Sequence, residues 1–232
     1  MHGTAHIHRL YWGMRVFLSL VLGLLSTLAA AESLPLVSSI EPGSPSERIL
    51  RQRLDLLFGK AGLSYTLTYR PAQRAELELQ NGQFAGDPAR TLAFGLRHPQ
   101  LLRLQAPLAI SHYYAFSQQQ RINSWQDLHG LSVSYPRGSR ELEQILRGQA
   151  TLWPVDSLQS CLAMVRAARS QICVTSSAVP LQRELSSLQR SWRISQFAPL
   201  AVYLYLQPEH AAAAQRLDPI LSNLQPQFKP VQ

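Results

Sequence analysis

Residues 135–139, with the sequence Tyr-Pro-Arg-Gly-Ser, join a segment that alternates like a β-strand to a segment rich in helix-forming residues. The first turn of a helix leaves backbone N–H groups unpaired and carries partial positive charge, so it attracts anions. Gly138 permits close approach of a ligand to the backbone, and Ser139 can cap the helix or bind the ligand. Arg137 adds a guanidinium group that can donate two hydrogen bonds to one anion. These residues predict an anion-binding turn. The alternative is an ordinary strand-turn-helix connection with Ser139 as the N-cap.

Histidines and carboxylates do not fall into a catalytic or metal-binding pattern. The four histidines beyond the N-terminal segment are His98, His112, His129 and His210, and none has the spacing of a metal pair or a catalytic triad. The sequence also lacks the Gly-x-Ser-x-Gly, His-Glu-x-x-His and phosphate-loop motifs. We therefore predict no enzymatic activity and no cofactor, and we expect His112 to form hydrogen bonds at a domain junction.

Four tyrosines, Tyr69, Tyr113, Tyr114 and Tyr135, lie in or beside predicted strands. Each could stack on a ligand or fill a hydrophobic core, and we expect at least two of them to be core residues. We include Tyr135 among the ligand-binding candidates because it directly precedes the predicted anion-binding turn.

The N-terminal segment resembles an export signal. Residues 14–31 place one Arg before an apolar run of about ten residues, which is too short to cross a membrane, and end in small residues. We predict that residues 1–31 are a signal peptide cleaved after Ala31, that translation starts at Met1 or Met14, and that the protein is periplasmic without stable membrane insertion. Cys161 and Cys173 would then enter an oxidising compartment, where they could form a disulfide or remain two buried thiols.

The charge balance is basic. Cleavage removes two of the 22 Lys and Arg residues and none of the 14 Asp and Glu residues, so the net charge falls from +8 to about +6. A positive net charge of this size favours binding to nucleic acid, to an anionic membrane surface or to small anions. The basic residues form no consecutive run, so we expect no nucleic-acid partner.

Alternation between strand and helix patterns predicts an α/β protein. The expected strands are residues 34–40, 64–69, 131–135, 151–155, 171–175 and 192–197. The expected helices are residues 47–61 (with Ser46 before the helix and Gly62 after it), 71–80, 139–147, 157–168, 178–188 and 209–224. Two long alternating stretches, residues 108–117 and 199–207, could cross between lobes. We predict two lobes joined by a two-strand hinge: residues 32–112 plus 200–232 form a discontinuous first lobe, and residues 113–199 form the second.

Three sequence stretches carry a resemblance to a known family. Residues 122–139 read INSWQDLHGLSVSYPRGS, residues 71–90 read PAQRAELELQNGQFAGDPAR, and residues 97–108 read RHPQLLRLQAPL. In this order they resemble landmarks of the bacterial extracellular solute-binding proteins of family 3, in particular a short stand-alone subgroup of the amino-acid ABC transporter type. The resemblance extends from about Glu47 to Leu224.

The resemblance implies a two-lobed type II periplasmic-binding-protein fold that closes on a small ligand and delivers it to an ABC-type importer. It implies that a first-lobe Arg binds the ligand carboxylate, for which Arg74, Arg90 and Arg97 are the candidates. Gly138 and Ser139 match the second-lobe turn of the family. Ser176 stands where amino-acid-binding members have an Asp that holds the ligand ammonium group.

Two departures from the family pattern affect the expected ligand. Ala85 occupies the position of a family Asp, with Asp87 two residues later, and the strand that should end in the ammonium-binding Asp offers Thr175, Ser176 and Ser177 instead. An ammonium group buried among hydroxyls would lack its counter-charge. We therefore expect a small anionic or neutral polar ligand, amino-acid-like or a carboxylate, rather than an ordinary α-amino acid.

Several functions remain open. The chain could serve a permease as a binding protein, report ligand to a membrane receptor as a sensor, or be a degenerate binding protein. A dehydratase or lytic activity is the enzymatic alternative. We expect a monomer, because hinge closure is a property of one chain.

Overall fold

The computed structural model describes residues 33–177 and 191–228. The predicted signal peptide and the helix predicted at residues 178–188 lie outside the described residues. Within the described ranges no helix is both long and apolar enough to cross a membrane.

The described elements alternate largely as the sequence predicts. The strands are β1 (Ser33–Ser38), β2 (Ser64–Tyr69), β3 (Gly86–Arg90), β4 (Leu102–Arg103), β5 (Ala109–Ser117), β6 (Ser132–Pro136), β7 (Thr151–Val155), β8 (Ile172–Ser177) and β9 (Arg193–Leu206). The helices are α2 (Pro45–Ala61), α3 (Ala72–Gln80), α4 (Leu92–Arg97), α5 (Arg140–Leu146), α6 (Leu158–Arg166) and α8 (Ala211–Leu224), with short 3-10 turns η2 (Gln126–Leu128), η4 (Pro208–His210) and η5 (Gln225–Gln227).

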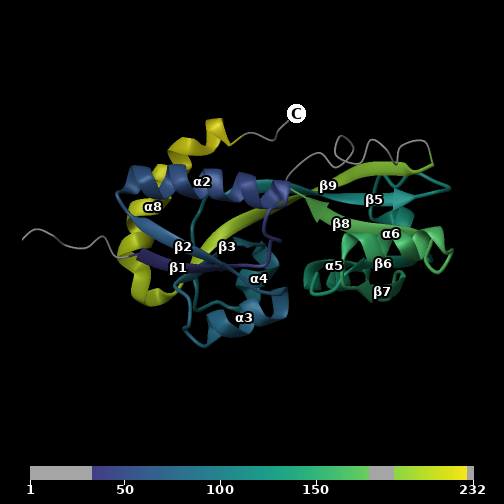
Figure 1. Ribbon diagram of the computed structural model, residues 1–232, viewed down its shortest axis with the longest axis horizontal. Helices are drawn as coiled ribbons and strands as arrows, with labels where there is room; N and C mark the ends of the chain where they lie inside the picture. The colour runs from purple at the N-terminus through teal and green to yellow at the C-terminus, as the bar shows by residue number, and fades with distance from the viewer. Residues whose placement is uncertain (1–32, 178–190, 229–232) are drawn as a thin grey trace, which may run out of the picture. The chain divides into compact units, whose positions relative to one another are not determined.

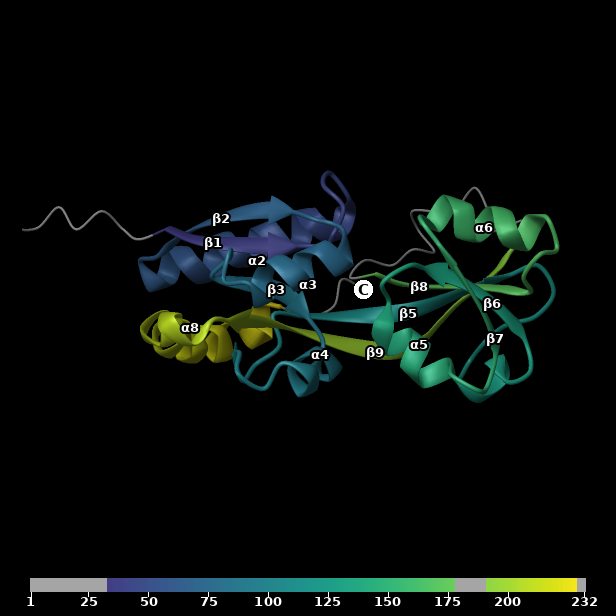
Figure 2. The same cartoon turned by 90° about the horizontal axis from the view of Figure 1, so that it is seen from below.

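The described strands form one mixed sheet in the order β2-β1-β3-β9-β5-β8-β6-β7, with β4 paired to β9. β1 pairs in parallel with β2 and β3, and β6 pairs in parallel with β7 and β8. The long strands β5 and β9 are antiparallel to each other and join these two parallel groups (Figure 2). We call the elements β1–β4, α2, α3, α4 and α8 the first half, and β6–β8, α5 and α6 the second half.

β9 differs from the sequence prediction. Residues 192–197 and 199–207 were expected as two strands, but one strand runs from Arg193 to Leu206. Its register against β5 shifts between the pairs Tyr113–Ala198 and Tyr114–Gln196, so Phe197 forms a bulge. A bulge beside Pro199 lets the strand continue through a residue that usually ends one.

Helices cover both faces of the sheet (Figure 1), and the strands alternate accordingly. On β5, Tyr113 and Ala115 join one hydrophobic cluster with residues of β6 and α5, while Tyr114 and Phe116 join another with residues of α6. In the first half, one cluster contains residues of α2 and α8 and another contains residues of α3 and α4. Side chains of a strand point to opposite faces in turn, so each strand serves two cores.

The first helix begins two residues earlier than expected. We predicted Ser46 before the helix, but Ser44 is the N-cap and Pro45 is the first helical residue. The Ser44 hydroxyl accepts a hydrogen bond from the N–H of Glu47 at 3.1 Å, and the Glu47 carboxylate accepts one from the N–H of Gly43. Proline lacks an N–H that this position would leave unpaired, which favours the earlier start. Gly62 ends the helix in the left-handed conformation, as predicted.

The sequence analysis missed β3 and α4. β3 contains Gly86, Asp87 and Pro88, so it has no alternating apolar pattern. A Cβ on Gly86 would lie 2.2 Å from the Tyr205 carbonyl oxygen of β9, which means that only glycine fits this pairing. Thr91 then caps α4 by accepting a hydrogen bond from the N–H of Phe94 at 3.4 Å. These two elements carry Arg90 and Arg97 of the candidate site.

Candidate ligand-binding site

A cavity of about 120 Å³ lies between residues of the two halves. The first half contributes side chains of α3, β3 and α4, and the second half contributes the start of α5 and the end of β8. Tyr113 of β5 and Leu200 of β9 also line it. The cavity thus lies beside the two strands that join the halves.

Arg90, the last residue of β3, is buried in this cavity with a fixed orientation. Its Nε donates a hydrogen bond to Asp87 at 2.6 Å, and its guanidinium lies 4.8 Å from the centre of the Phe94 ring. Arg90 is 9% exposed and Asp87 is 1% exposed. Burial raises the pKa of the Asp87 carboxyl group, and the charge of Arg90 opposes that effect. The Nη2 atom of Arg90 is buried and has no hydrogen-bond partner in the described residues.

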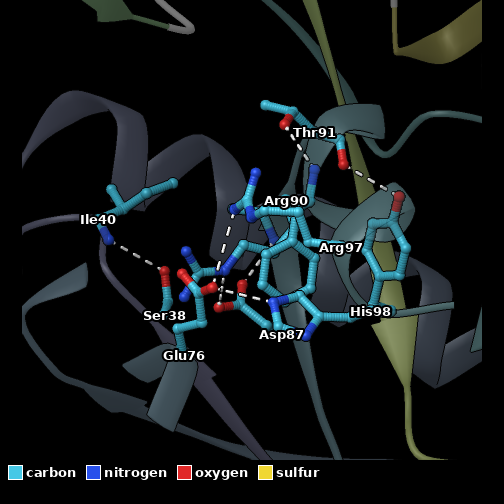
Figure 3. Close-up of polar contacts among 11 residues, drawn as sticks. Ser38, Ile40, Glu76, Asp87, Arg90, Thr91, Arg97 and His98 are labelled. Atoms are coloured by element: carbon cyan, nitrogen blue, oxygen red, sulfur yellow. Dashed lines mark hydrogen bonds and ion pairs between the residues drawn. The ribbon is translucent and has the colours of Figure 1, made fainter. Parts of the chain in front are cut away.

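Glu76 of α3 is the centre of a second charged group in the cavity (Figure 3). Its Oε1 lies 2.9 Å from Nε2 of His98, 3.8 Å from Nη2 of Arg97 and 3.6 Å from Nη1 of Arg140. Burial alone would raise the pKa of Glu76, but the hydrogen bond with His98 and the charges of Arg140 and Arg97 outweigh burial and lower it. Glu76 therefore holds an ionised carboxylate between the two halves, because Arg140 belongs to α5.

The turn that was predicted to bind an anion reaches the cavity only in part. Gly138 and Ser139 line it, and Gly138 has the positive φ of 88° that favours glycine. The Ser139 hydroxyl donates to the Pro136 carbonyl oxygen at 2.9 Å and does not cap α5, which is only seven residues long. Arg137 instead donates to Asp156 at 3.3 Å at the exposed surface.

The second half also contributes hydroxyl groups and one carboxylate. Thr175 and Ser176 line the cavity at the end of β8, where the family pattern has a carboxylate. Glu141, the second residue of α5, lines it too, and its buried Oε2 has no hydrogen-bond partner in the part of the chain that the structure describes.

Most of the predicted site residues gather at one place. The cavity brings together Arg90, Arg97, Gly138, Ser139 and Ser176.

Three other predicted site residues do not line the cavity. The Arg74 side chain is 66% exposed and pairs with Glu78 at 2.5 Å. Tyr135 is buried in a core, where its hydroxyl donates to Glu143 at 2.8 Å. Arg137 pairs with Asp156, as described above.

Sequence reasoning missed several lining residues: Glu76, Thr91, Phe94, Arg140 and Glu141. All five lie within three residues of a predicted site residue. Proximity in sequence could have indicated them, but no residue pattern distinguishes them from solvent-exposed neighbours.

Cys161 and Cys173 form a disulfide, with their Cα atoms 5.5 Å apart. It joins α6 to β8 within a hydrophobic cluster that also contains Tyr114 and Trp192. The hydroxyl of Ser134 donates to the Cys161 carbonyl oxygen at 3.2 Å. The disulfide thus ties α6 to β8, the strand whose end lines the cavity.

No cluster of His, Cys, Asp and Glu that could hold a metal ion occurs among residues 33–177 and 191–228.

His112 lies on β5, where it pairs with Ser177 of β8 on one side and with Pro199 of β9 on the other. Burial lowers the pKa of its imidazole.

Solved structures with the same architecture decide the fold. The chain superposes on the GluR0 ligand-binding core in complex with L-glutamate with a TM-score of 0.66 and 11% identity, covering 84% of this chain and 93% of that one. The chain has the two-lobed α/β fold of the type II periplasmic binding proteins. An ancestral arginine-binding protein bound to arginine superposes with a TM-score of 0.65 and 14% identity, over 84% of this chain and 92% of that one.

One further solved structure and one sequence relative are also similar to this chain. The ancestral amino acid-binding protein AncCDT-1, a precursor of cyclohexadienyl dehydratase, superposes with a TM-score of 0.63 and 13% identity, over 84% of this chain and 90% of that one. No family model matches the sequence. An uncharacterized protein of Shewanella oneidensis is 28% identical over 128 residues, which is 52% of this chain and 48% of the relative. The match thus spans about half of that relative.

Proposed function

We propose that this protein is a periplasmic solute-binding protein that captures a small carboxylate-bearing ligand between its two lobes and delivers it to an ABC-type importer. The observation that carries the proposal is Arg90, a buried guanidinium held by Asp87 with Nη2 unpartnered in the described residues of the cavity. Leaving such a donor without a partner is costly, so a bound acceptor is favoured.

The chemistry of the cavity favours a carboxylate as that acceptor. A guanidinium presents several N–H donors in a planar fork, and a charge-assisted bond to a carboxylate is stronger than a neutral one. Arg97 lies on the same side of the cavity, and Thr175 and Ser176 supply hydroxyls on the opposite side. The ligands of similar folds, L-glutamate and arginine in the structures named above, both carry a carboxylate.

The size of the cavity and its place between two lobes are consistent with capture of a small solute. We expect closure of the lobes around that solute and a monomeric protein, with a membrane permease as the receiving partner. We also propose that the lobes meet at the predicted boundaries, between residues 112 and 113 and between residues 199 and 200.

A thermal-shift and calorimetry screen tests the proposal. The protein from Glu32 onward is screened against small carboxylates, amino acids, inorganic phosphate and polyols. A ligand at about 100 times its Kd stabilises the fold by about 2.7 kcal/mol. We expect a carboxylate-bearing compound to raise the melting temperature, and Arg90→Gln to abolish the shift.

Arg74→Gln is the matched control, because Arg74 is exposed and lies outside the cavity. It should bind like the wild type. Equal binding by Arg90→Gln and wild type, or a response to polyols alone, would refute the proposed role of Arg90.

A further inference from the structure

Three leucines of α3 and α4, in the first half, are exposed to solvent. Leu77 of α3 is 56% exposed, and Leu92 and Leu96 of α4 are 50% and 84% exposed. They are three of the five large hydrophobic residues that are exposed among residues 33–177 and 191–228. A single exposed leucine is ordinary, but three on neighbouring helices need an explanation.

α3 and α4 pack on the same face of the sheet. Ala75 and Leu79 of α3 share a hydrophobic cluster with Phe94 of α4, whereas α2 and α8 pack on the opposite face (Figure 1). The side-chain nitrogen of Gln80 also lies 3.1 Å from Nδ1 of His98, just after α4. The outward faces of these two helices therefore belong to one surface of the first half.

The leucines occupy those outward faces. Leu77 lies two residues from the buried Ala75 on one side and two from the buried Leu79 on the other, which turns it away from the core. Leu92 and Leu96 are four residues apart, so they share a face of α4. We call the exposed residues of both helices the α3–α4 surface: the three leucines together with Gln73, Arg74, Gln80 and Arg97.

The α3–α4 surface is positively charged, because it contains two arginines and no acidic residue. The two glutamates of α3 are buried, and each forms ion pairs with two arginines. Each of these groups has two positive charges and one negative charge, so a positive charge remains in excess. The groups are Glu78 with Arg70 and Arg74, and Glu76 with Arg97 and Arg140.

Arg103 of β4 adds a further positive charge on this face of the sheet. It is exposed, and its guanidinium lies 4.5 Å from the centre of the Tyr203 ring, which belongs to the same hydrophobic cluster as Phe94. Its Nη1 donates to the carbonyl oxygens of Leu104 and Gln105, at 3.3 Å each. These uncharged acceptors do not neutralise the guanidinium.

Exposed leucines beside arginines with excess positive charge match the chemistry of an anionic lipid surface. Apolar side chains enter the boundary between headgroups and acyl chains, and arginines are attracted to anionic headgroups. Interfaces between proteins are instead enriched in aromatic residues, and leucine is under-represented among the residues that dominate their binding energy.

We propose that the α3–α4 surface binds reversibly to an anionic phospholipid membrane, with Leu77, Leu92 and Leu96 inserted among the lipids. Reversible binding at the surface needs no membrane-spanning segment. The inference goes beyond the proposed function and does not depend on it, because no solute takes part.

Binding to protein-free vesicles tests the inference. The protein is the chain from Glu32 onward, which contains every described residue and so all four hydrophobic clusters. Flotation measures its binding to vesicles of phosphatidylglycerol and phosphatidylethanolamine in equal parts, and to vesicles of phosphatidylcholine alone. We expect about tenfold tighter binding to the anionic vesicles. Raising the salt concentration from about 0.1 M to 1 M shortens the screening length from about 10 Å to 3 Å and should weaken that binding.

The double variant Leu92→Ser with Leu96→Ser tests insertion. It should weaken binding to the anionic vesicles by roughly tenfold, because less apolar area is buried among the lipids. Its melting temperature should match that of the wild type, since both leucines are exposed. Leu77→Ser repeats the test on α3 and should give a smaller loss in the same direction. Trp153→Ser is the control: Trp153 is also exposed but belongs to β7 of the second half, so this variant should bind like the wild type.

The double variant Arg74→Gln with Arg103→Gln tests the charge. It should weaken binding by roughly tenfold, since each arginine near an anionic surface contributes to the attraction. Arg48→Gln with Lys60→Gln is the matched control. It removes the same amount of charge from exposed positions of α2, which packs on the opposite face of the sheet, and should bind like the wild type.

Three outcomes would overturn the inference. The first is an absence of binding to the anionic vesicles. The second is equal binding by the wild type and the leucine variants, or an equal loss in both arginine and α2 variants, because overall net charge would then cause the attraction. The third is binding only to membrane vesicles that retain their proteins, which would show that the partner is a membrane protein. The ligand screen, which tests solute capture, is unaffected by any of these results.

Discussion

Asp87 accepts a 2.6 Å hydrogen bond from Nε of Arg90, three residues further along the chain. This bond uses one edge of the guanidinium and leaves Nη2 in the cavity without a partner in the described residues. The ring of Phe94, 4.8 Å away, supports the guanidinium from α4. A cationic donor held in this way binds a ligand with little loss of conformational entropy, because its orientation is fixed beforehand.

Replacement of Asp87 should damage both stability and binding. Asp87→Asn removes the charge that pairs with the buried Arg90, and breaking a buried pair from one side costs about 3–5 kcal/mol. Urea denaturation should report this loss, and calorimetry should report weaker binding of whichever carboxylate binds the wild type. Asp156→Asn is the control, since Asp156 is exposed and pairs with Arg137 at the surface, where a change of at most about 1 kcal/mol is expected. A fully stable Asp87→Asn protein would contradict the assigned role of the pair.

The Glu76 group should make stability depend on pH. Its folded pKa lies below the ordinary value of 4.5, so Glu76 binds its proton more weakly in the folded state than in the unfolded state. The stabilisation is therefore complete above about pH 4.5 and is lost as the pH falls through the folded pKa. The difference in free energy of unfolding between wild type and Glu76→Gln should shrink as the pH is lowered below 4.5. A difference that grows on acidification would mean that Glu76 is protonated in the fold.

Two glycine substitutions should change stability in opposite directions. Gly86→Ala places a Cβ 2.2 Å from the Tyr205 carbonyl oxygen, so β3 must separate from β9 and stability should fall by more than about 1 kcal/mol. In Gly59→Ala, no atom lies within 4 Å of the new Cβ, and Gly59 sits inside α2. Alanine should stabilise that helix by about 0.5–1 kcal/mol. Thermal unfolding of both variants measures the contrast, and a neutral Gly86→Ala would show that the β3–β9 pairing can relax.

Local sequence patterns were sufficient for most elements. The alternation of β2 and the apolar face of α2 follow from residues a few positions apart, and Gly62 marks the end of α2 by its own conformation. The same patterns failed at β3, whose small and polar residues are accepted only because β1 and β9 flank it. They failed also at β9, which was expected as two strands and is one strand that continues through the bulge at Phe197.

For the candidate site, the sequence by itself determined which charged residues the chain has and, through the family resemblance, that Arg90 and Arg97 were among the candidates. It determined the α/β class as well, because periodicity is a local property. Only the tertiary structure decided that Arg74 is exposed, that Arg137 faces Asp156, and that Glu141 lines the cavity with Arg90. Burial and the lack of a partner depend on groups brought together from distant parts of the chain, and neither is encoded in the residues next to a side chain.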